Sequence, residues 1–157
     1  MSKLQSLIEE YLKGPPLLRQ AIAGLKREQL LARPVPGKWS TLEVVAHLAD
    51  FDPIYADRMK RVIAEDNPAL LGADQDLFAA GLAYHDRDAQ EELAIIEMTR
   101  SQMARILRKL PDSALKRIGN HNERGPLTLE QLLSGVSNHI AHHVKFIHEK
   151  RQALGLK

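Results

Sequence analysis

Apolar residues recur with the period of an α-helix along most of this chain, which strongly limits the folds open to it. After Ser40 they return at spacings of three and four residues, at Val44, Leu48, Phe51, Tyr55, Met59 and Val62. This spacing places them on one face of a helix, and that face has to pack against another element. Signals for β-strands are weak throughout the sequence. The pattern therefore predicts an all-α protein.

Proline, glycine and capping residues divide the chain into four helical stretches. Gly14-Pro15-Pro16 predicts a break or a strong kink in the first helix, and Pro53 a kink in the second, because proline lacks the backbone donor. A long crossover, which holds a short helix near residues 74–82, joins the second helix to the third. Four amphipathic helices with such a crossover describe a four-helix bundle, expected as a single domain over residues 1–157. The predicted helices cover about residues 2–25, 40–62, 88–110 and 128–153, and the crossover residues 67–86.

Two of these helices begin with a recognisable capping pattern. Ser40 is followed three residues later by Glu43, and Thr128 by Gln131. In such a capping box each side chain accepts a hydrogen bond from the backbone N–H of the other residue. Trp39 precedes the first of these boxes and is expected to pack over the helix start.

The composition argues against several classes of protein. The formal net charge is only +2, the basic residues are scattered, and aromatic residues make up 4% of the chain, so nucleic acid is an unfavoured partner. No apolar run approaches the roughly 20 residues of a membrane-spanning helix, and the N-terminus lacks the apolar stretch of a signal peptide. Without cysteines, nothing depends on an oxidising compartment. We therefore expect a cytoplasmic protein that binds neither nucleic acid nor membranes.

A pair of histidines on the fourth helix is the most informative feature. His139 and His143 are four residues apart, so both project from one face of that helix. They fall near the middle of its apolar stripe, which indicates that they point into the bundle. The stripe consists of Leu132, Val136, Ile140, Phe146 and Ile147.

Two buried imidazoles are costly without partners, because each neutral ring has a donor and an acceptor to satisfy and two protonated rings repel. A metal ion meets this need by taking a lone pair from each ring. His47, on the flank of the second helix's stripe, is a third candidate ligand. Three histidines form an open site whose remaining position water or a substrate completes. The plainer alternative is that each histidine is a core residue whose ring nitrogens form hydrogen bonds within the protein.

The same residues resemble the DinB/YfiT-like superfamily. The segment Gly37–Asp50, with the sequence GKWSTLEVVAHLAD, is followed in the last helix by HIAHH at residues 139–143. Proteins of that superfamily start their second helix at a Trp-Ser or Trp-Thr pair, carry one histidine on it, and have a His-x-x-x-His pair on the last long helix. The resemblance extends from the first helix to about Leu154.

This resemblance implies a four-helix bundle, often a homodimer, with a divalent metal held by His47, His139 and His143. Characterised members of the superfamily include transferases that attach low-molecular-weight thiols to electrophilic substrates, and a thiol-dependent isomerase. A metal-dependent transferase with a small-molecule substrate is therefore the leading hypothesis. Since the chain has no cysteine, the thiol would be external.

Three other hypotheses remain open: a hydrolase in which the metal activates water, a non-catalytic bundle stapled by the metal, and a metal-free interaction module. Three imidazoles with oxygen donors suit zinc, nickel, copper and ferrous iron alike, so the sequence does not select the metal.

Four other polar residues could take part in the site, and a plainer interpretation is favoured for each. Asp50 could orient an imidazole, but a solvated position is favoured. His121 and Arg124 lie in a polar turn that we expect to be an exposed connection, although Arg124 could receive a carboxylate. His142 is expected on the helix surface. Solvated positions are also expected for His85, His148, Glu9, Glu10, Glu91 and Glu92.

Overall fold

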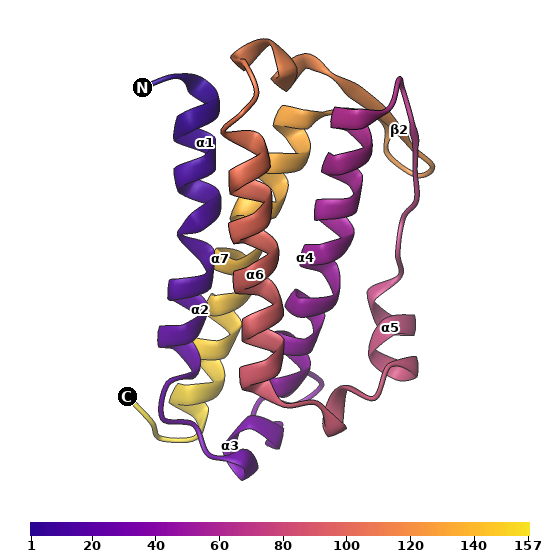
Figure 1. Cartoon of the computed structure of the whole chain (residues 1–157). Helices are drawn as coiled ribbons and strands as arrows, with labels where there is room; N and C mark the ends of the chain where they lie inside the picture. Colours follow the sequence, from indigo (N-terminus) through magenta and orange to yellow (C-terminus); the bar gives the residue numbers. More distant parts are fainter.

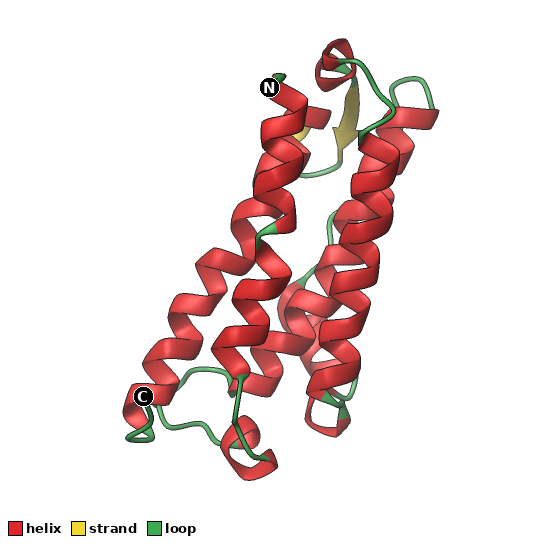
Figure 2. Ribbon diagram, turned by 60° about the vertical axis from the view of Figure 1, so that its left-hand side comes forward, coloured by secondary structure: helices red, strands yellow, loops and turns green.

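The computed structural model describes residues 1–157 as a bundle of long helices with a small sheet at one end (Figure 2). Two consecutive helices, α1 and α2, form one member of the bundle, and α4, α6 and α7 form the other three. Two short helices, α3 and α5, lie in the connections. The helices are α1 (Lys3–Leu12), α2 (Gly14–Ile22), α3 (Arg27–Leu31), α4 (Thr41–Ala64), α5 (Gln75–Gly81), α6 (Ala89–Leu107) and α7 (Leu129–Ala153). The predicted four-helix bundle is confirmed.

The long crossover gives the bundle its topology. After α4 the chain returns along the outside of the bundle through α5, so that α6 starts at the same end as α4 and runs parallel to it (Figure 1). A single 3-10 turn, Tyr84–Asp86, leads into α6. Helix α4 packs against both α6 and α7, and α7 also packs against α1 and α2. No helix combines the length and apolar character that crossing a membrane requires.

The helix starts follow the capping pattern of the sequence. Ser40 accepts from the backbone N–H of Glu43 while the Glu43 carboxylate accepts from the Ser40 N–H, and Thr128 and Gln131 do the same for α7. Both predicted capping boxes are confirmed. Pro53 lies inside α4, which continues through it to Ala64.

The first predicted helix is two helices. Helix α1 ends at Leu12 and α2 begins at Gly14, with Pro15 in its first turn. Because Pro15 has no backbone N–H, the carbonyl oxygen of Tyr11 is left without its helical donor. The predicted break is therefore confirmed, and it exposes an acceptor to the interior of the bundle.

A three-stranded sheet, which the weak strand signals of the sequence did not predict, lies at one end of the bundle. Strand β1 (Ala69–Leu70) pairs in parallel with β2 (Ile118–His121), and β2 pairs antiparallel with β3 (Gly125–Thr128). Strands of two to four residues are too short to show an alternating pattern, so they leave only a weak signal in the sequence. The pairing of Leu70 with His121 ties the crossover to the connection before α7.

Arg100 on α6 links the other three members of the bundle, although its side chain is fully buried. Its guanidinium donates to Asp52 Oδ1 on α4 at 3.0 and 2.7 Å, and to the Val136 carbonyl oxygen on α7 at 2.8 Å. It also donates at 2.6 Å to the Tyr11 carbonyl oxygen, the acceptor that the proline leaves free. A Cβ on Gly14 would lie 2.5 Å from the Arg100 Nη1, so only glycine leaves room for this side chain.

Replacing Asp52 by alanine is expected to destabilise the protein strongly, because Arg100 would keep its charge in the core without a counter-charge. We expect the free energy of unfolding, measured with urea, to fall by about 3–5 kcal/mol. The matched control is Glu97→Ala, which removes the more exposed ion pair with Arg19 and should cost less than about 1 kcal/mol. Equal losses in the two variants would contradict this role of Arg100.

Candidate metal centre

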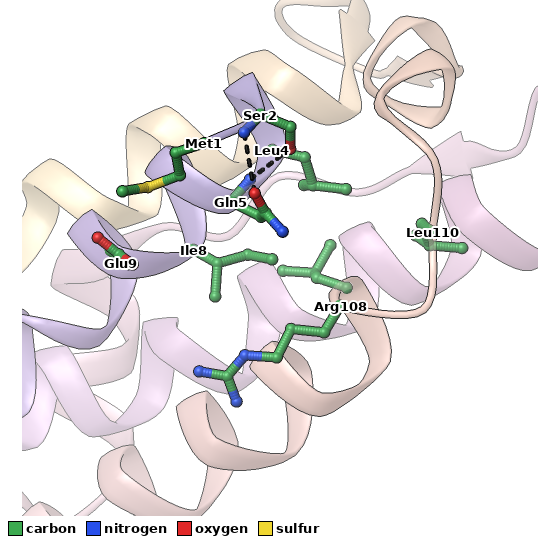
Figure 3. A pocket seen from close by; sticks show the side chains of 9 residues that line it. Met1, Ser2, Leu4, Gln5, Ile8, Glu9, Arg108 and Leu110 are labelled. Atoms are coloured by element: carbon green, nitrogen blue, oxygen red, sulfur yellow. Dashed lines mark hydrogen bonds between the residues drawn. The ribbon is translucent and has the colours of Figure 1, made fainter.

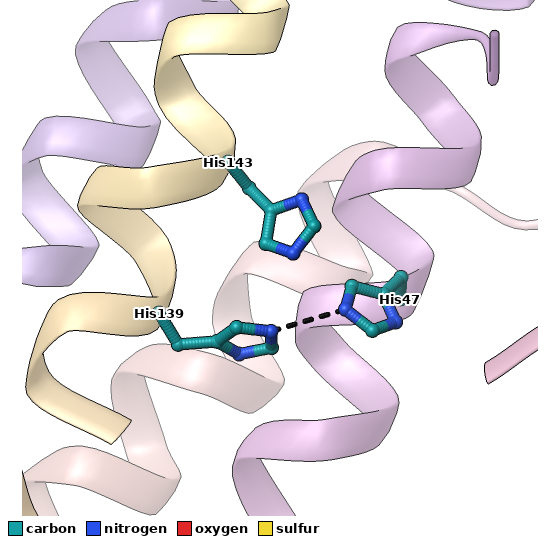
Figure 4. Close-up of side chains that lie close together, drawn as sticks. All are labelled: His47, His139 and His143. Carbon is teal, nitrogen blue, oxygen red and sulfur yellow. Dashed lines mark hydrogen bonds between the residues drawn. The ribbon is translucent and has the colours of Figure 1, made fainter. Parts of the chain in front are cut away.

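Three histidine side chains from two helices point toward one another inside the bundle (Figure 4). His47 lies two turns after the start of α4, and His139 and His143 lie one turn apart in the middle of α7. One ring nitrogen from each residue lies within 4.8 Å of the others. The Nε2 atoms of His47 and His139 are 3.1 Å apart. The structure thus brings together the three residues that the sequence singled out.

Burial keeps these imidazoles neutral. His47 is 1% exposed, and His139 and His143 are half-buried. Burial lowers the pKa of His47 to about 3, with a further contribution from His143. Burial, together with a smaller effect of neighbouring imidazoles, lowers the pKa of His139 to about 3 and that of His143 to about 4. At neutral pH the rings therefore carry free lone pairs and no charge.

Protein contacts leave two imidazole nitrogens of this cluster without a partner and set two others facing each other. The Nδ1 atoms of His47 and His139 are buried without a hydrogen-bond partner. Imidazole nitrogens that share one ion at about 2 Å stand about 3 Å apart, which is close to the 3.1 Å between His47 and His139. The donor set, its spacing and its neutral state all fit a divalent metal, with His47, His139 and His143 as the residues that would hold it.

Aromatic rings wall the cluster, and a cavity reaches one side of it. The Trp39 and Phe51 ring centroids lie 5.3 and 4.6 Å from that of His47. A cavity of about 360 Å³ is lined by His143, Trp39 and Phe146, among others. It gives a small molecule access to His143 from the surface. Trp39 packs over the start of α4, as expected, and also forms part of this cavity.

A larger hollow, of about 490 Å³, lies between the start of α1 and the end of α6 (Figure 3). No histidine lines it. Its polar groups serve the helix start, because Ser2 and Gln5 satisfy each other's backbone N–H in a capping box. Glu9 and Arg108, which also line it, are exposed side chains, so this hollow holds neither a buried polar group nor a cluster of potential metal ligands.

Asp50 does not contact the histidines. Its carboxylate accepts from both terminal nitrogens of Arg87, at 2.6 and 3.0 Å. Glu92, which we expected in solvent, is buried and accepts from the same Arg87 at 3.0 Å. The prediction for Glu92 is wrong because the arginine comes from the crossover, and sequence spacing does not show where a crossover packs.

The polar turn before α7 is only partly the exposed connection that we expected. Arg124 is exposed, but His121 is 6% exposed, and its Nδ1 accepts from the backbone N–H groups of Glu123 and Arg124 at 3.1 and 3.2 Å. His121 therefore stabilises the turn between β2 and β3. His142, His85 and His148 are exposed, as expected, and the His142 ring packs 5.2 Å from that of His143.

The family comparison agrees with this site. The sequence profile of the DinB superfamily matches residues 10–147, a stretch that includes all three histidines. A protein from Oceanobacillus iheyensis is 28% identical over 133 residues, which cover 85% of this chain and 77% of that protein. YfiT from Bacillus subtilis is 28% identical over 142 residues, or 90% of this chain and 80% of its own length. Both are named metal-dependent hydrolases, and both names mark the activity as provisional.

A solved structure shares the fold. YfiT from Bacillus subtilis superposes with a TM-score of 0.91 at 27% identity, over 100% of this chain and 91% of its own. It is described as "a probable metal-dependent hydrolase with an unusual four-helix bundle topology". The names of the relatives and the three-histidine cluster together support a divalent metal in this chain.

The metal-free protein should lose stability as the pH falls from 6.5 to 5. The folded-state pKa values of the three histidines, about 3 to 4, lie below the ordinary 6.5. In this range the unfolded chain therefore takes up protons that the folded chain does not. Each such histidine contributes up to about 1.4 kcal/mol per pH unit, and above pH 6.5 its contribution is constant.

Urea unfolding of the metal-free protein at several pH values measures this slope. His139→Gln should flatten it, whereas His148→Gln, on the exposed face of the same helix, should leave it unchanged. A slope that is insensitive to both substitutions would contradict the neutral buried cluster.

Proposed function

This chain belongs to the DinB superfamily, and we propose that it is a metal-dependent transferase that attaches a low-molecular-weight thiol to a small electrophilic substrate. The observation that carries the proposal is the convergence of His47, His139 and His143, whose ring nitrogens lie within 4.8 Å of one another. In this proposal the three imidazoles hold one divalent ion, with zinc, nickel and iron as the candidates. Bound there, the ion would act as a Lewis acid that lowers the pKa of a thiol or water ligand.

The histidines would do this work without changing their own charge. All three are neutral at pH 7, because burial holds their pKa values near 3 to 4. The apolar rings of Trp39 and Phe51 limit the water that reaches His47. The cavity beside His143 leaves one side of the cluster open to a small molecule. Since the chain has no cysteine, the thiol would be supplied by a co-substrate.

The two carboxylates that flank His47 in the sequence of α4 are engaged by arginines, so neither is free to act as a base beside it. Glu43 accepts hydrogen bonds from Arg33 and from the Ser40 backbone, and Asp50 is held by Arg87. Hydrolysis of an amide needs a group that protonates the leaving nitrogen. A thiol with a lowered pKa can attack a carbon that carries a good leaving group without such help.

A metal-dependent hydrolase is the second candidate, and the names of the relatives favour it. Asp76 and Glu149 are exposed side chains that line the cavity beside His143. In a hydrolase one of these carboxylates would accept the proton of the attacking water. In the transferase neither is required.

We also propose that residues 1–157 form one DinB-like helical domain that acts as a cytoplasmic homodimer. The superfamily resemblance supports the dimer, and so do the exposed apolar side chains of Ile95 and Met98 on α6. The absence of cysteines supports a reducing compartment.

Thioether formation from a small thiol and an activated aryl chloride tests the transferase. In this reaction a C–S bond forms, the C–Cl bond breaks, chloride leaves and the thiol proton passes to the buffer. We expect a rate that requires both metal and thiol and that falls by more than about 100-fold in His143→Ala, since even partners outside the ligand set typically contribute 10- to 100-fold. His142→Ala, next to it on the exposed face, is the control.

A second assay distinguishes the two candidates. The protein loaded with zinc, nickel or ferrous iron is supplied with an activated ester and no thiol. Metal-dependent ester hydrolysis, together with no thioether formation, would contradict the transferase and support the hydrolase.

A further inference from the structure

A buried lysine faces the same cavity as the candidate metal centre, and the proposed function does not use it. Lys150 lies on α7 seven residues after His143, which places both on one face of the helix. Its side chain is 3% exposed. Its one hydrogen bond runs from Nζ to the Phe146 carbonyl oxygen at 3.4 Å. Two of its three N–H donors therefore have no protein partner.

The charge of Lys150 is also uncompensated. Neither Lys150 nor Lys38, which lines the same cavity, takes part in any ion pair of the chain. Of the acidic groups around it, Glu149 is exposed and Glu43 is already held by Arg33. An ammonium group that is buried without a counter-ion costs free energy, so an anion that pairs with it would be bound favourably.

The cavity places this cation and a candidate metal ligand around one space. Its lining includes His143, Lys150, Lys38, Trp39 and Phe146, and its volume is about 360 Å³. Seven helical residues advance about 10 Å, and the Lys150 side chain turns back along α7 toward His143 to reach the Phe146 carbonyl. The ammonium and the imidazole therefore line the same cavity at two different levels of the helix.

We propose that Lys150 binds the carboxylate of a small acidic thiol and so places the sulfur of that thiol at the histidine cluster, an inference that rests on the proposed function. Trp39 and Phe146 pack against the apolar middle of this ligand. At the cavity mouth the exposed Lys38 lies among the exposed carboxylates Asp76 and Glu149, so the buried Lys150 supplies the selective positive charge. Lys150 thereby determines which thiols the protein accepts. It does not take part in bond formation.

The single tryptophan of the chain gives a direct measurement, because Trp39 lines this cavity. The metal-loaded protein is titrated with mercaptoalkanoic acids of increasing chain length and with the matching mercaptoalkanamides, and Trp39 fluorescence and calorimetry report binding. We expect the best acid to bind about tenfold more tightly than its amide, since a charge-assisted contact is replaced by a neutral one. Lys150→Met should abolish this preference, while the metal content and the affinity for the amide remain unchanged.

Two variants separate charge from packing. Lys150→Arg keeps the cation and should restore most of the preference for the acid. Lys145→Met removes an exposed lysine from the same helix and should behave as the parent protein. If Lys150→Met keeps the preference with unchanged metal content, or if the parent protein has none, the proposal is overturned.

Acids without sulfur separate the failure of this proposal from the failure of the proposed function. In one outcome the parent protein prefers alkanoic acids to alkanamides, Lys150→Met removes that preference, and the thiol group adds no affinity. This outcome would support the carboxylate site and contradict the thiol co-substrate. If the thiol group adds affinity but Lys150→Met leaves the preference for the acid unchanged, the thiol co-substrate stands and the role of Lys150 is contradicted.

Discussion

The buried guanidinium of Arg100 is the interaction on which the arrangement of this bundle depends. It bonds to α1, α4 and α7 from its own position on α6, and so connects all four members of the bundle at one level. The Tyr11 carbonyl oxygen is free to accept from Arg100 because Pro15 has no backbone N–H to donate to it. Gly14, which has no Cβ, leaves room for the guanidinium. Asp52 and Val136 lie within about two turns of His47 and His139, respectively, on the same helices. The network therefore also holds together the two helices that carry the candidate ligands.

Burial of the three histidines costs free energy, and it also keeps their rings in the neutral form that can bind a metal. Two Nδ1 atoms have no partner within the protein, and the same desolvation that makes burial of the cluster costly keeps it uncharged. A divalent ion would use the lone pairs that the neutral rings offer. The aromatic rings around His47 close one side, and the cavity at His143 opens another. An open side is what the proposed reaction requires, whereas protein ligands would enclose the ion of a purely structural staple.

Much of the bundle and the three histidines could be predicted because their signals are local. Capping boxes at Ser40 and Thr128 give the helix starts, and the spacing of four between His139 and His143 gives their common face. Contacts between residues far apart in the chain could not be predicted, because no local sequence pattern indicates them. The Arg100–Asp52 pair spans 48 residues, and the strands contain only two to four residues each.

The prediction for Glu92 failed for the same reason, because its partner Arg87 is brought to it by the packing of the crossover. Lys150 was missed because a lysine near the end of a helix usually lies in solvent. Its spacing of seven from His143 was the one sign, visible in the sequence, that both residues share a face.

The metal content of the purified protein tests the central claim most directly. Elemental analysis after reconstitution and dialysis should find close to one equivalent of a divalent metal in the parent protein and in His142→Ala, and little in His47→Ala, His139→Ala and His143→Ala. One equivalent retained by all three of these variants, or none in the parent protein, would contradict a metal held by His47, His139 and His143.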